Sequence, residues 1–446
     1  MMLSLLIFFP LVAAIAVLFS GKRAKEVALT ATILELIFSV YVAFRFIPES
    51  GTQFNENYWW VQSLGISYHI GMDGISLLLV LLTTVLSPLI ILSSFQHNHK
   101  NPPLFYFLIL VMQMALIGVF VALDGFLFYI FWELALIPIY LICLIWGGRD
   151  RVRITLKFFI YTLFGSLLML AALIWLWSQT AFPHTFDIQA FYSLSLDPSA
   201  QSWIFWALFL AFAIKIPIFP FHTWQPDTYT DSPTAGTMLL SGIMLKMGLY
   251  GILRWLLPIV PEGFGEWANV AILLSVIGIV YASLIAWAQK DFKRLIAYSS
   301  IAHVGLIAAG IFSLSFQGMH GGIFQMLSHG VNVVGLFFIA DILQRRTGTR
   351  EIDDLGGIRQ TAPAFATYFI IILLASIALP LTNGFVGEFL LLNGLYQYNM
   401  VAAAFAGLTI ILGAVYMLNA YRKIVLGENK SVGSIFIDLN ISEKCV

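Results

Sequence analysis

Long apolar runs follow one another along the whole chain, and they restrict its fold more than any other feature. A helix needs about 20 consecutive apolar residues to cross the hydrocarbon core of a bilayer. The chain has 446 residues, of which 60% are hydrophobic and 10% charged, and one water-soluble core could not bury so much apolar surface. The sequence therefore predicts an all-α polytopic membrane protein with about 13 spans, near residues 2–20, 27–47, 72–95, 103–122, 124–146, 154–178, 202–222, 234–260, 267–288, 295–313, 319–344, 362–394 and 398–424.

The basic residues are concentrated in alternate loops, and this distribution predicts the orientation of the spans in the membrane. Of the 23 Lys and Arg residues, all but four fall in the first loop, in the alternating loops on its side, or in the tail. The exceptions are Arg45 and Arg254 near the opposite face, and Lys215 and Lys246 inside spans. Because basic loops stay in the cytoplasm, we expect the N-terminus outside and the C-terminus in the cytoplasm. The outer loops 48–71 and 179–201 are interpreted as surface cover.

The cysteine and glycine patterns exclude several kinds of cofactor site. The two cysteines, Cys143 and Cys445, are far apart, so the chain has no CxxC pair and no iron–sulfur spacing. Neither a GxGxxG nor a GxxxxGK[ST] nucleotide motif occurs. We expect no cofactor and no metal bound to this chain. The balanced charge gives no indication of nucleic-acid binding.

Proline interrupts two of the predicted spans. The first break lies around Pro217 and Pro220, and the second around Pro380 and Gly384. Proline removes a backbone donor and clashes with the preceding turn. The carbonyls that it frees are tolerated at membrane depth only against protein or a watery cavity. Two broken helices therefore indicate two functional positions within the membrane.

The places of the two breaks predict an internal repeat. Residues 103–260 contain the fourth to eighth spans and residues 261–427 the ninth to thirteenth, so that the broken helix is fourth of five in both. Repeats with an odd number of spans have opposite topologies, which is the inverted-repeat architecture of many transporters. We expect these two repeats after an N-terminal three-helix segment, residues 1–102, and before a short polar tail, residues 428–446.

Ionisable residues inside the spans are candidate functional groups, because each costs roughly 2.5–3.5 kcal/mol to insert. Glu133 lies in the fifth span and Lys215 beside the first break, where we expect freed carbonyls to support its ammonium group. A nearby carboxylate favours the charged lysine, and its withdrawal favours release of the proton. A purely structural ion pair is the alternative for Glu133.

Five more ionisable residues extend this set. Lys246 has glycines on both sides, which permit close helix packing, and snorkelling to an interface is its alternative role. His303 and His329 can relay protons or serve as hydrogen-bonded core residues. Glu388 occupies the position in the second broken helix that corresponds to Lys215, and His222 follows the first break. Together these groups can form a proton path at the membrane midplane.

At these residues the chain resembles a known family. Phe131–Leu134, Lys215–Asp227, Ser232–Gly236 and Leu245–Gly248 are similar to the antiporter-like subunits of respiratory complex I and of Mrp cation/proton antiporters. Glu388, after Asn-Gly-Phe-Val-Gly, is similar to the M (chain 4) branch, whose sister subunits carry lysine there. Members usually have a fourteenth span, and no apolar run follows residue 424 to supply it.

The resemblance implies roles, partners and a location. Glu133 and Lys215 would be the modulating pair, Lys246 the connecting lysine and Glu388 the exit-side residue, with His303 and His329 between the half-channels. The chain would pump protons as a subunit of an NADH:quinone oxidoreductase, beside neighbouring antiporter-like subunits in the lipid bilayer. The NADH and quinone sites would lie in other subunits. The expected location is a bacterial-type inner (plasma) membrane.

Two other functions remain open at this point. A subunit of a cation/proton (Na⁺/H⁺) antiporter would share the fold, and sodium-dependent transport would favour it. A structural scaffold would use its buried charges only to pair with one another. Replacing Lys215 with Met tests the scaffold function: if the chain is a scaffold, pumping per assembled complex is unchanged by this replacement.

Overall fold

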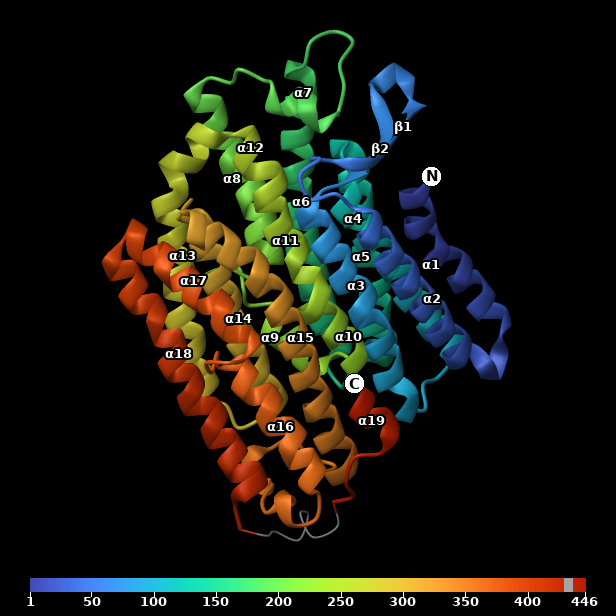
Figure 1. Ribbon diagram of the computed structural model, residues 1–446, viewed down its shortest axis with the longest axis vertical. Coiled ribbons are helices and arrows are strands. Elements are labelled where there is room, and N and C mark those ends of the chain that lie inside the picture. The colour runs from blue at the N-terminus through green and yellow to red at the C-terminus, as the bar shows by residue number, and fades with distance from the viewer. Residues whose placement is uncertain (429–435) are drawn as a thin grey trace. The chain divides into compact units, whose positions relative to one another are not determined.

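The computed structural model describes residues 1–428 and 436–446. They form two compact units. Unit 1 comprises Met1–Ile216 and Ile243–Trp267, and unit 2 comprises Pro217–Gly242 and Ala268–Val446. Figure 1 shows that helices make up most of both units. Of the predicted tail 428–446, residues 429–435 lie outside the described part.

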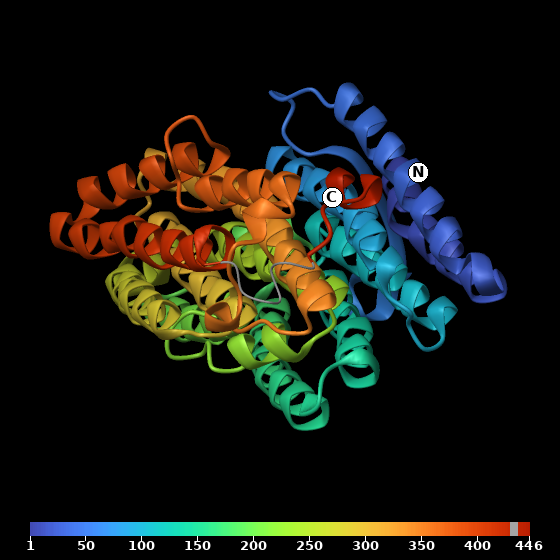
Figure 2. The ribbon, with the colours of Figure 1, turned by 90° about the horizontal axis from the view of Figure 1, so that it is seen from below.

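Unit 1 contains the N-terminal helices and one further segment from the middle of the chain, Ile243–Trp267. Helix α2 packs against α1, α3 and α4, and the first three of the chain's long helices appear in shades of blue in Figure 2. The helices are α1 (Met2–Phe19), α2 (Ala24–Arg45), α3 (Gly74–Ser93), α4 (Pro102–Val121), α5 (Gly125–Trp146), α6 (Arg151–Gln179), α7 (Ile188–Tyr192), α8 (Pro198–Lys215), α11 (Leu245–Gly251) and α12 (Leu257–Ile259).

Unit 2 is built around three helices that pack against one another, α14, α15 and α17. Helix α13 (Pro261–Ala288) begins in unit 1 and continues in unit 2. The other helices of unit 2 are α9 (Gln225–Asp231), α10 (Thr234–Leu239), α14 (Phe292–Phe312), α15 (Phe316–Thr347), α16 (Pro363–Ser376), α17 (Asn383–Tyr398), α18 (Met400–Tyr421) and α19 (Ile441–Cys445).

Eleven helices within the described residues are long and apolar enough to cross a membrane. This confirms an all-α polytopic membrane protein. The predicted spans 202–222 and 362–394 are not among the eleven, because both are interrupted at their prolines. Helix α8 ends at Lys215 after 18 residues, and α16 ends after 14 residues. The chain resumes a helix only at α9 and α17, respectively.

The loop 48–71, which we expected to be surface cover, holds a two-stranded antiparallel hairpin that was not predicted. Strand β1 is Gln53–Val61 and strand β2 is Ile66–Met72. Gly65 closes the turn with φ of 66°, and a side chain there would meet the carbonyl oxygen of His184 at 1.8 Å. Only glycine combines this backbone conformation with so close an approach.

The hairpin is fastened to the beginning of α5. The Asp124 carboxylate accepts hydrogen bonds from the backbone N–H groups of Phe126 and Leu127, which caps the helix, and from the N–H of Ser67 on β2. The backbone N–H of Leu123 also donates to the His69 carbonyl at 2.9 Å. Two further backbone bonds join the loop before α7 to this point, from Gly125 to Phe186 and from Ile188 to Leu123.

Candidate functional site: buried ionisable side chains

Lys215 is the last residue of α8, and its side chain is enclosed by protein. It is 2% exposed, and its Nζ has no hydrogen-bond partner among the described residues. The ammonium group lies 5.1 Å from the ring centroid of Trp132 on α5, which provides a cation–π contact. Our expectation that freed carbonyls would support it is wrong. The carbonyl of Phe212, in the last turn of α8, instead accepts from the N–H of Ile216 at 2.8 Å.

Glu133 follows Trp132 on α5 and interacts electrostatically with Lys215. Its buried Oε1 accepts no hydrogen bond from the described part of the chain. The lysine and the carboxylate are therefore close enough to influence each other, yet Lys215 has no hydrogen bond that would hold it to Glu133. Coulomb energy between charges changes steeply with distance at low dielectric. A small shift of α5 relative to α8 would change the proton affinity of Lys215.

Lys246 is completely buried at 0% exposure, so it does not snorkel to an interface. It lies on α11, which is preceded by a π-helical turn, Leu240–Met244, and followed by another, Ile252–Leu256. Such turns often occur at functional sites. A Cβ on Gly248 would lie 2.9 Å from the carbonyl oxygen of Phe212. The absence of a side chain at Gly248 thus lets α11 pack closely on α8, the helix that ends at Lys215.

In unit 2, Glu388 and His303 form a buried hydrogen-bonded pair. The Nδ1 atom of His303 on α14 lies 2.8 Å from Oε1 of Glu388 on α17. The same oxygen accepts a hydrogen bond from Nε2 of Gln325 on α15, at 3.2 Å. Glu388 is 1% exposed and His303 7%. Three helices thus converge on one carboxylate, a contact that the sequence analysis did not anticipate.

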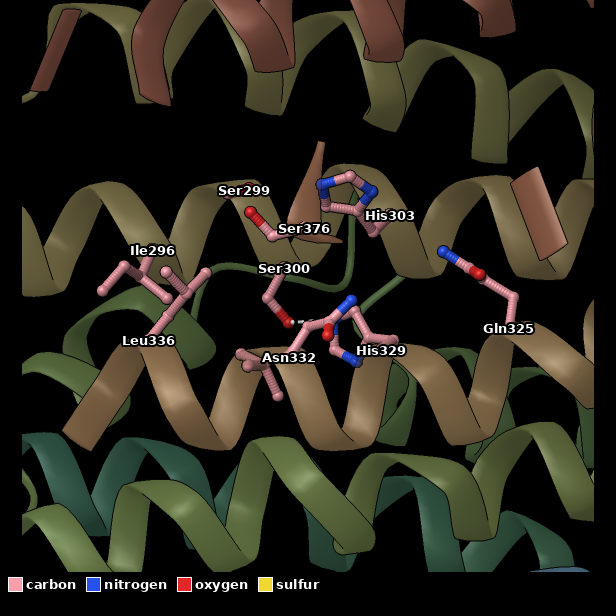
Figure 3. A pocket seen from close by; sticks show the side chains of 10 residues that line it. Ile296, Ser299, Ser300, His303, Gln325, His329, Asn332, Leu336 and Ser376 are labelled. Atoms are coloured by element: carbon pink, nitrogen blue, oxygen red, sulfur yellow. Dashed lines mark hydrogen bonds between the residues drawn. The ribbon is translucent and has the colours of Figure 1, made fainter. Parts of the chain in front are cut away.

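His329 lies next to this pair on α15. Its ring centroid is 6.3 Å from that of His303, and its Nε2 is 3.0 Å from the hydroxyl of Ser300. Both histidines line a cavity in which the centre of a water molecule has about 20 Å³ of space, enough for at least one water. Figure 3 shows the two rings on facing helices at this cavity.

The polar side chain of Asn332 supports the second break. Its Nδ2 donates to the carbonyl of Ala375 at 3.1 Å, close to the end of α16. Its Oδ1 accepts from Nδ2 of Asn383, the first residue of α17, at 3.2 Å. The polar residues of α15 recur at helical spacing, at Gln325, His329 and Asn332. This polar stripe is the sequence signal by which Gln325 and Asn332 could have been predicted as site residues.

His222 has a different environment, between aromatic rings of unit 2. Its ring centroid is 5.7 Å from that of Phe219 and 5.2 Å from that of Tyr281, and the residue is 4% exposed. Among the described residues, no group of three or more His, Cys, Asp or Glu side chains could hold a metal ion. The fold and these side chains define a polytopic membrane protein with ionisable groups clustered inside its spans.

Comparison with known proteins identifies the family within this class. A sequence model described as "NADH:quinone oxidoreductase/Mrp antiporter, TM" matches residues 122–413. A second, described as "NADH-ubiquinone oxidoreductase chain 4, amino terminus", matches residues 2–119. The chain belongs to this family of antiporter-like membrane subunits.

Individual relatives agree with the family match. NADH-quinone oxidoreductase subunit M of Rickettsia typhi is 44% identical over 441 residues, which cover 96% of this chain and 88% of the relative. The protein of the same name from Rhodobacter capsulatus is 42% identical over 467 residues, with 100% and 90% coverage. A chain of respiratory complex I from Thermus thermophilus with bound NADH superposes with a TM-score of 0.92 at 33% identity, covering 100% of this chain and 92% of that one.

Proposed function

We propose that this chain is a proton-translocating membrane subunit of an NADH:quinone oxidoreductase. Electron transfer from NADH to quinone would take place in other subunits, and this chain, with no cofactor of its own, would use the released energy to move protons. The observation that carries the proposal is Lys215, a buried lysine without a hydrogen-bond partner in the described chain but within electrostatic reach of Glu133. The names of the relatives support the kind of complex.

The proposed path runs from Glu133 and Lys215 through Lys246 to unit 2. When Glu133 is near, Lys215 holds its proton, and when Glu133 withdraws, the proton passes to Lys246. The histidines that line the water-sized cavity would carry it on to Glu388, the exit-side residue, and His222 would assist near the first break. Moving one proton against the membrane potential costs about 2.3 kcal/mol per 100 mV, which a change in the charge of a buried neighbour can supply.

The architecture that accompanies this function is also a proposal. We infer 13 spans, with inverted repeats over residues 103–260 and 261–427 and a broken helix in each. The N-terminus would lie outside and the C-terminus in the cytoplasm, in a bacterial-type inner (plasma) membrane. Neighbouring antiporter-like subunits would be its partners. The sorting of basic residues and the match to a complex I chain support this arrangement.

The deciding experiment replaces Lys215 with Met in the whole complex. We expect assembled complexes with this change to pump fewer protons per electron after reconstitution into liposomes, because the neutral side chain cannot carry a proton. The control is Lys22→Met, which removes an exposed lysine just before the start of α2. Normal pumping by the Lys215→Met complex at wild-type electron flux would show that the proposed site is wrong.

Cation/proton exchange is the second candidate, because the family model includes Mrp antiporters. It predicts that complexes containing this chain transport Na⁺ against H⁺ without electron transfer. The same liposomes test it, with a sodium gradient applied in place of NADH. Proton movement that follows the sodium gradient and stops in the Lys215→Met complex would favour this candidate.

A further inference from the structure

Glu35 is a buried carboxyl group on a helix that the proposed path does not use. It lies near the middle of α2, and its side chain is turned into unit 1, with 1% exposure. Neither of its oxygens accepts a hydrogen bond from any residue that the structure describes. Burying an ionised carboxylate in this way is far more costly than burying the neutral acid.

The helices around Glu35 offer it no cation. Within the bounds of α1, α3 and α4, which pack against α2, the sequence contains a single titratable side chain, Tyr106 on α4. The Tyr106 hydroxyl lies 2.9 Å from the hydroxyl of Ser94. The charged residues of α2 itself, Lys25, Glu26 and Arg45, lie at its two ends. This environment favours the protonated form of Glu35.

Two contacts fix the register of α2 against α3. The ammonium of Lys25 lies 5.3 Å from the ring centroid of Phe95, so the beginning of α2 is beside the end of α3. Farther along, the hydroxyls of Ser39 and Thr84 are 2.7 Å apart. One helical turn from this pair towards the beginning of α2 leads to Glu35. One turn towards the end of α3 leads to Ser87, at the same depth.

Two buried hydroxyls lie on this side of α3 between this depth and its end, at Ser87 and, seven residues farther along, at Ser94. Ser87 is 0% exposed and Ser94 is 2% exposed, and Ser94 contacts Tyr106, which interacts electrostatically with Glu26 at the beginning of α2. Gln113 on α4 lies as many residues beyond the start of its helix as Glu35 does on α2. Both polar atoms of the Gln113 amide are buried without a hydrogen-bond partner in the described chain.

We propose that Glu35 is a proton-binding site that exchanges protons with the aqueous phase at the end of α3, along Ser87, Ser94 and Tyr106. Gln113 is a second buried polar side chain on α4, a helix that packs against α2. The N-terminal three-helix segment thereby has a proton site separate from Glu133 and Lys215. This inference goes beyond the proposed function, because Glu35 can bind and exchange a proton whether or not the complex pumps through Lys215.

Reaction with a hydrophobic carbodiimide tests the protonated state directly. The neutral acid adds across one C=N bond of dicyclohexylcarbodiimide: its oxygen bonds to the central carbon, and its proton moves to nitrogen. An acyl shift from oxygen to nitrogen then gives a stable N-acylurea. Membranes containing the whole complex are treated at a series of pH values, and the adduct is located by peptide mass spectrometry.

We expect an adduct on Glu35 whose rate of formation falls by about tenfold per pH unit once the acid ionises. A water-soluble carbodiimide should instead modify exposed carboxylates such as Glu49 and leave Glu35 intact. After a rapid pH jump, Tyr106→Phe should delay the change in the rate at Glu35, because it removes the last of the three hydroxyls. Either the absence of an adduct on Glu35 at every pH or a rate independent of pH would overturn the proposal.

Two variants separate proton binding from a structural role. Glu35→Gln has the shape of the neutral acid, so assembly should match the wild type while labelling at position 35 disappears. Glu35→Asp keeps an acid and should still be labelled. If Glu35→Gln prevented assembly, the carboxyl group would be required for folding and not for proton exchange, and the inference would be wrong. None of these outcomes depends on the pumping assay for Lys215.

Discussion

The Nδ1 atom of His303 lies 2.8 Å from Oε1 of Glu388, although 85 residues separate the two in the chain. A proton that leaves or reaches this carboxylate therefore changes the charge next to the imidazole. Because His303 also lines the cavity that it shares with His329, the pair connects α17 to the space between α14 and α15. The first prediction follows from this contact.

Replacing Glu388 with Gln should lower the number of protons pumped per electron and leave assembly intact. The amide oxygen can still accept the hydrogen bond from His303, so the geometry is kept while the titrating group is lost. Proton uptake or release by reconstituted complexes measures the effect. Glu49→Gln, at an exposed position, is the matched control. Unchanged stoichiometry in the Glu388→Gln complex would exclude Glu388 from the path.

Replacing Trp132 with Leu should destabilise the charged form of Lys215. A desolvated cation–π contact contributes up to about 2 kcal/mol, and the ring centroid is 5.1 Å from the ammonium group. We expect a changed pH profile of coupled activity, with Trp132→Phe closer to the wild type. Trp60→Leu, at a residue that is 55% exposed, controls for loss of an indole. Identical profiles for all three variants would contradict the role of the ring.

Gly248→Ala should lower the stability of unit 1. The added Cβ would lie 2.5 Å from a side-chain carbon of Ile216 and 2.9 Å from the carbonyl oxygen of Phe212, and overpacking of this kind costs about 1–3 kcal/mol. Gly407→Ala is the control, because no atom lies within 4 Å of a Cβ at Gly407. The melting temperature of the solubilised complex measures both variants. Equal values would mean that α8 and α11 can separate freely.

Asn332→Leu should loosen the second break. It removes the donor to the carbonyl of Ala375 and the acceptor for the side chain of Asn383, and each such hydrogen bond contributes about 0.5–1.5 kcal/mol. Faster hydrogen exchange in residues 377–382 would report the loosening. Asn98→Leu, in an exposed loop, should leave this exchange unchanged. Protection of the segment in the Asn332→Leu protein would show that Asn332 is dispensable for the break.

An acid-dependent contribution to stability is expected from Asp187, outside the spans. Burial alone would raise its pKa, but the hydrogen bond from His69 at 2.6 Å and the neighbouring backbone donors hold the pKa below its ordinary value. The contribution is therefore present above about pH 4, the ordinary pKa of aspartate, and is lost as pH falls through the lower, folded value. His69→Gln should reduce the difference in melting temperature between pH 7 and acid pH. An unchanged difference would show that the pair does not contribute.

The breaks and the spans could be predicted, because they depend on residues close together in the sequence. The contacts between helices could not be predicted in this way. Pro217 and Pro380 remove hydrogen bonds within their own helices, so both interruptions were visible in the sequence. Trp132 contacts Lys215 from another helix, and His303 contacts Glu388 from another helix. No sequence spacing relates the two members of either pair. Glu35 was hidden for a similar reason, since a single carboxylate hardly changes the hydropathy of its apolar run.

The hydrogen bonds around Asp124 hold the beginning of α5 in place. They hold the beginning of that helix to the hairpin, while Glu133 lies eight residues farther along than Gly125, about 12 Å at 1.5 Å per residue. If α5 rotates by about 10° about this fixed end, Glu133 moves sideways by about 2 Å. The hairpin would then fix the position of one end of α5, so that a small displacement of its other end changes the charge of Lys215.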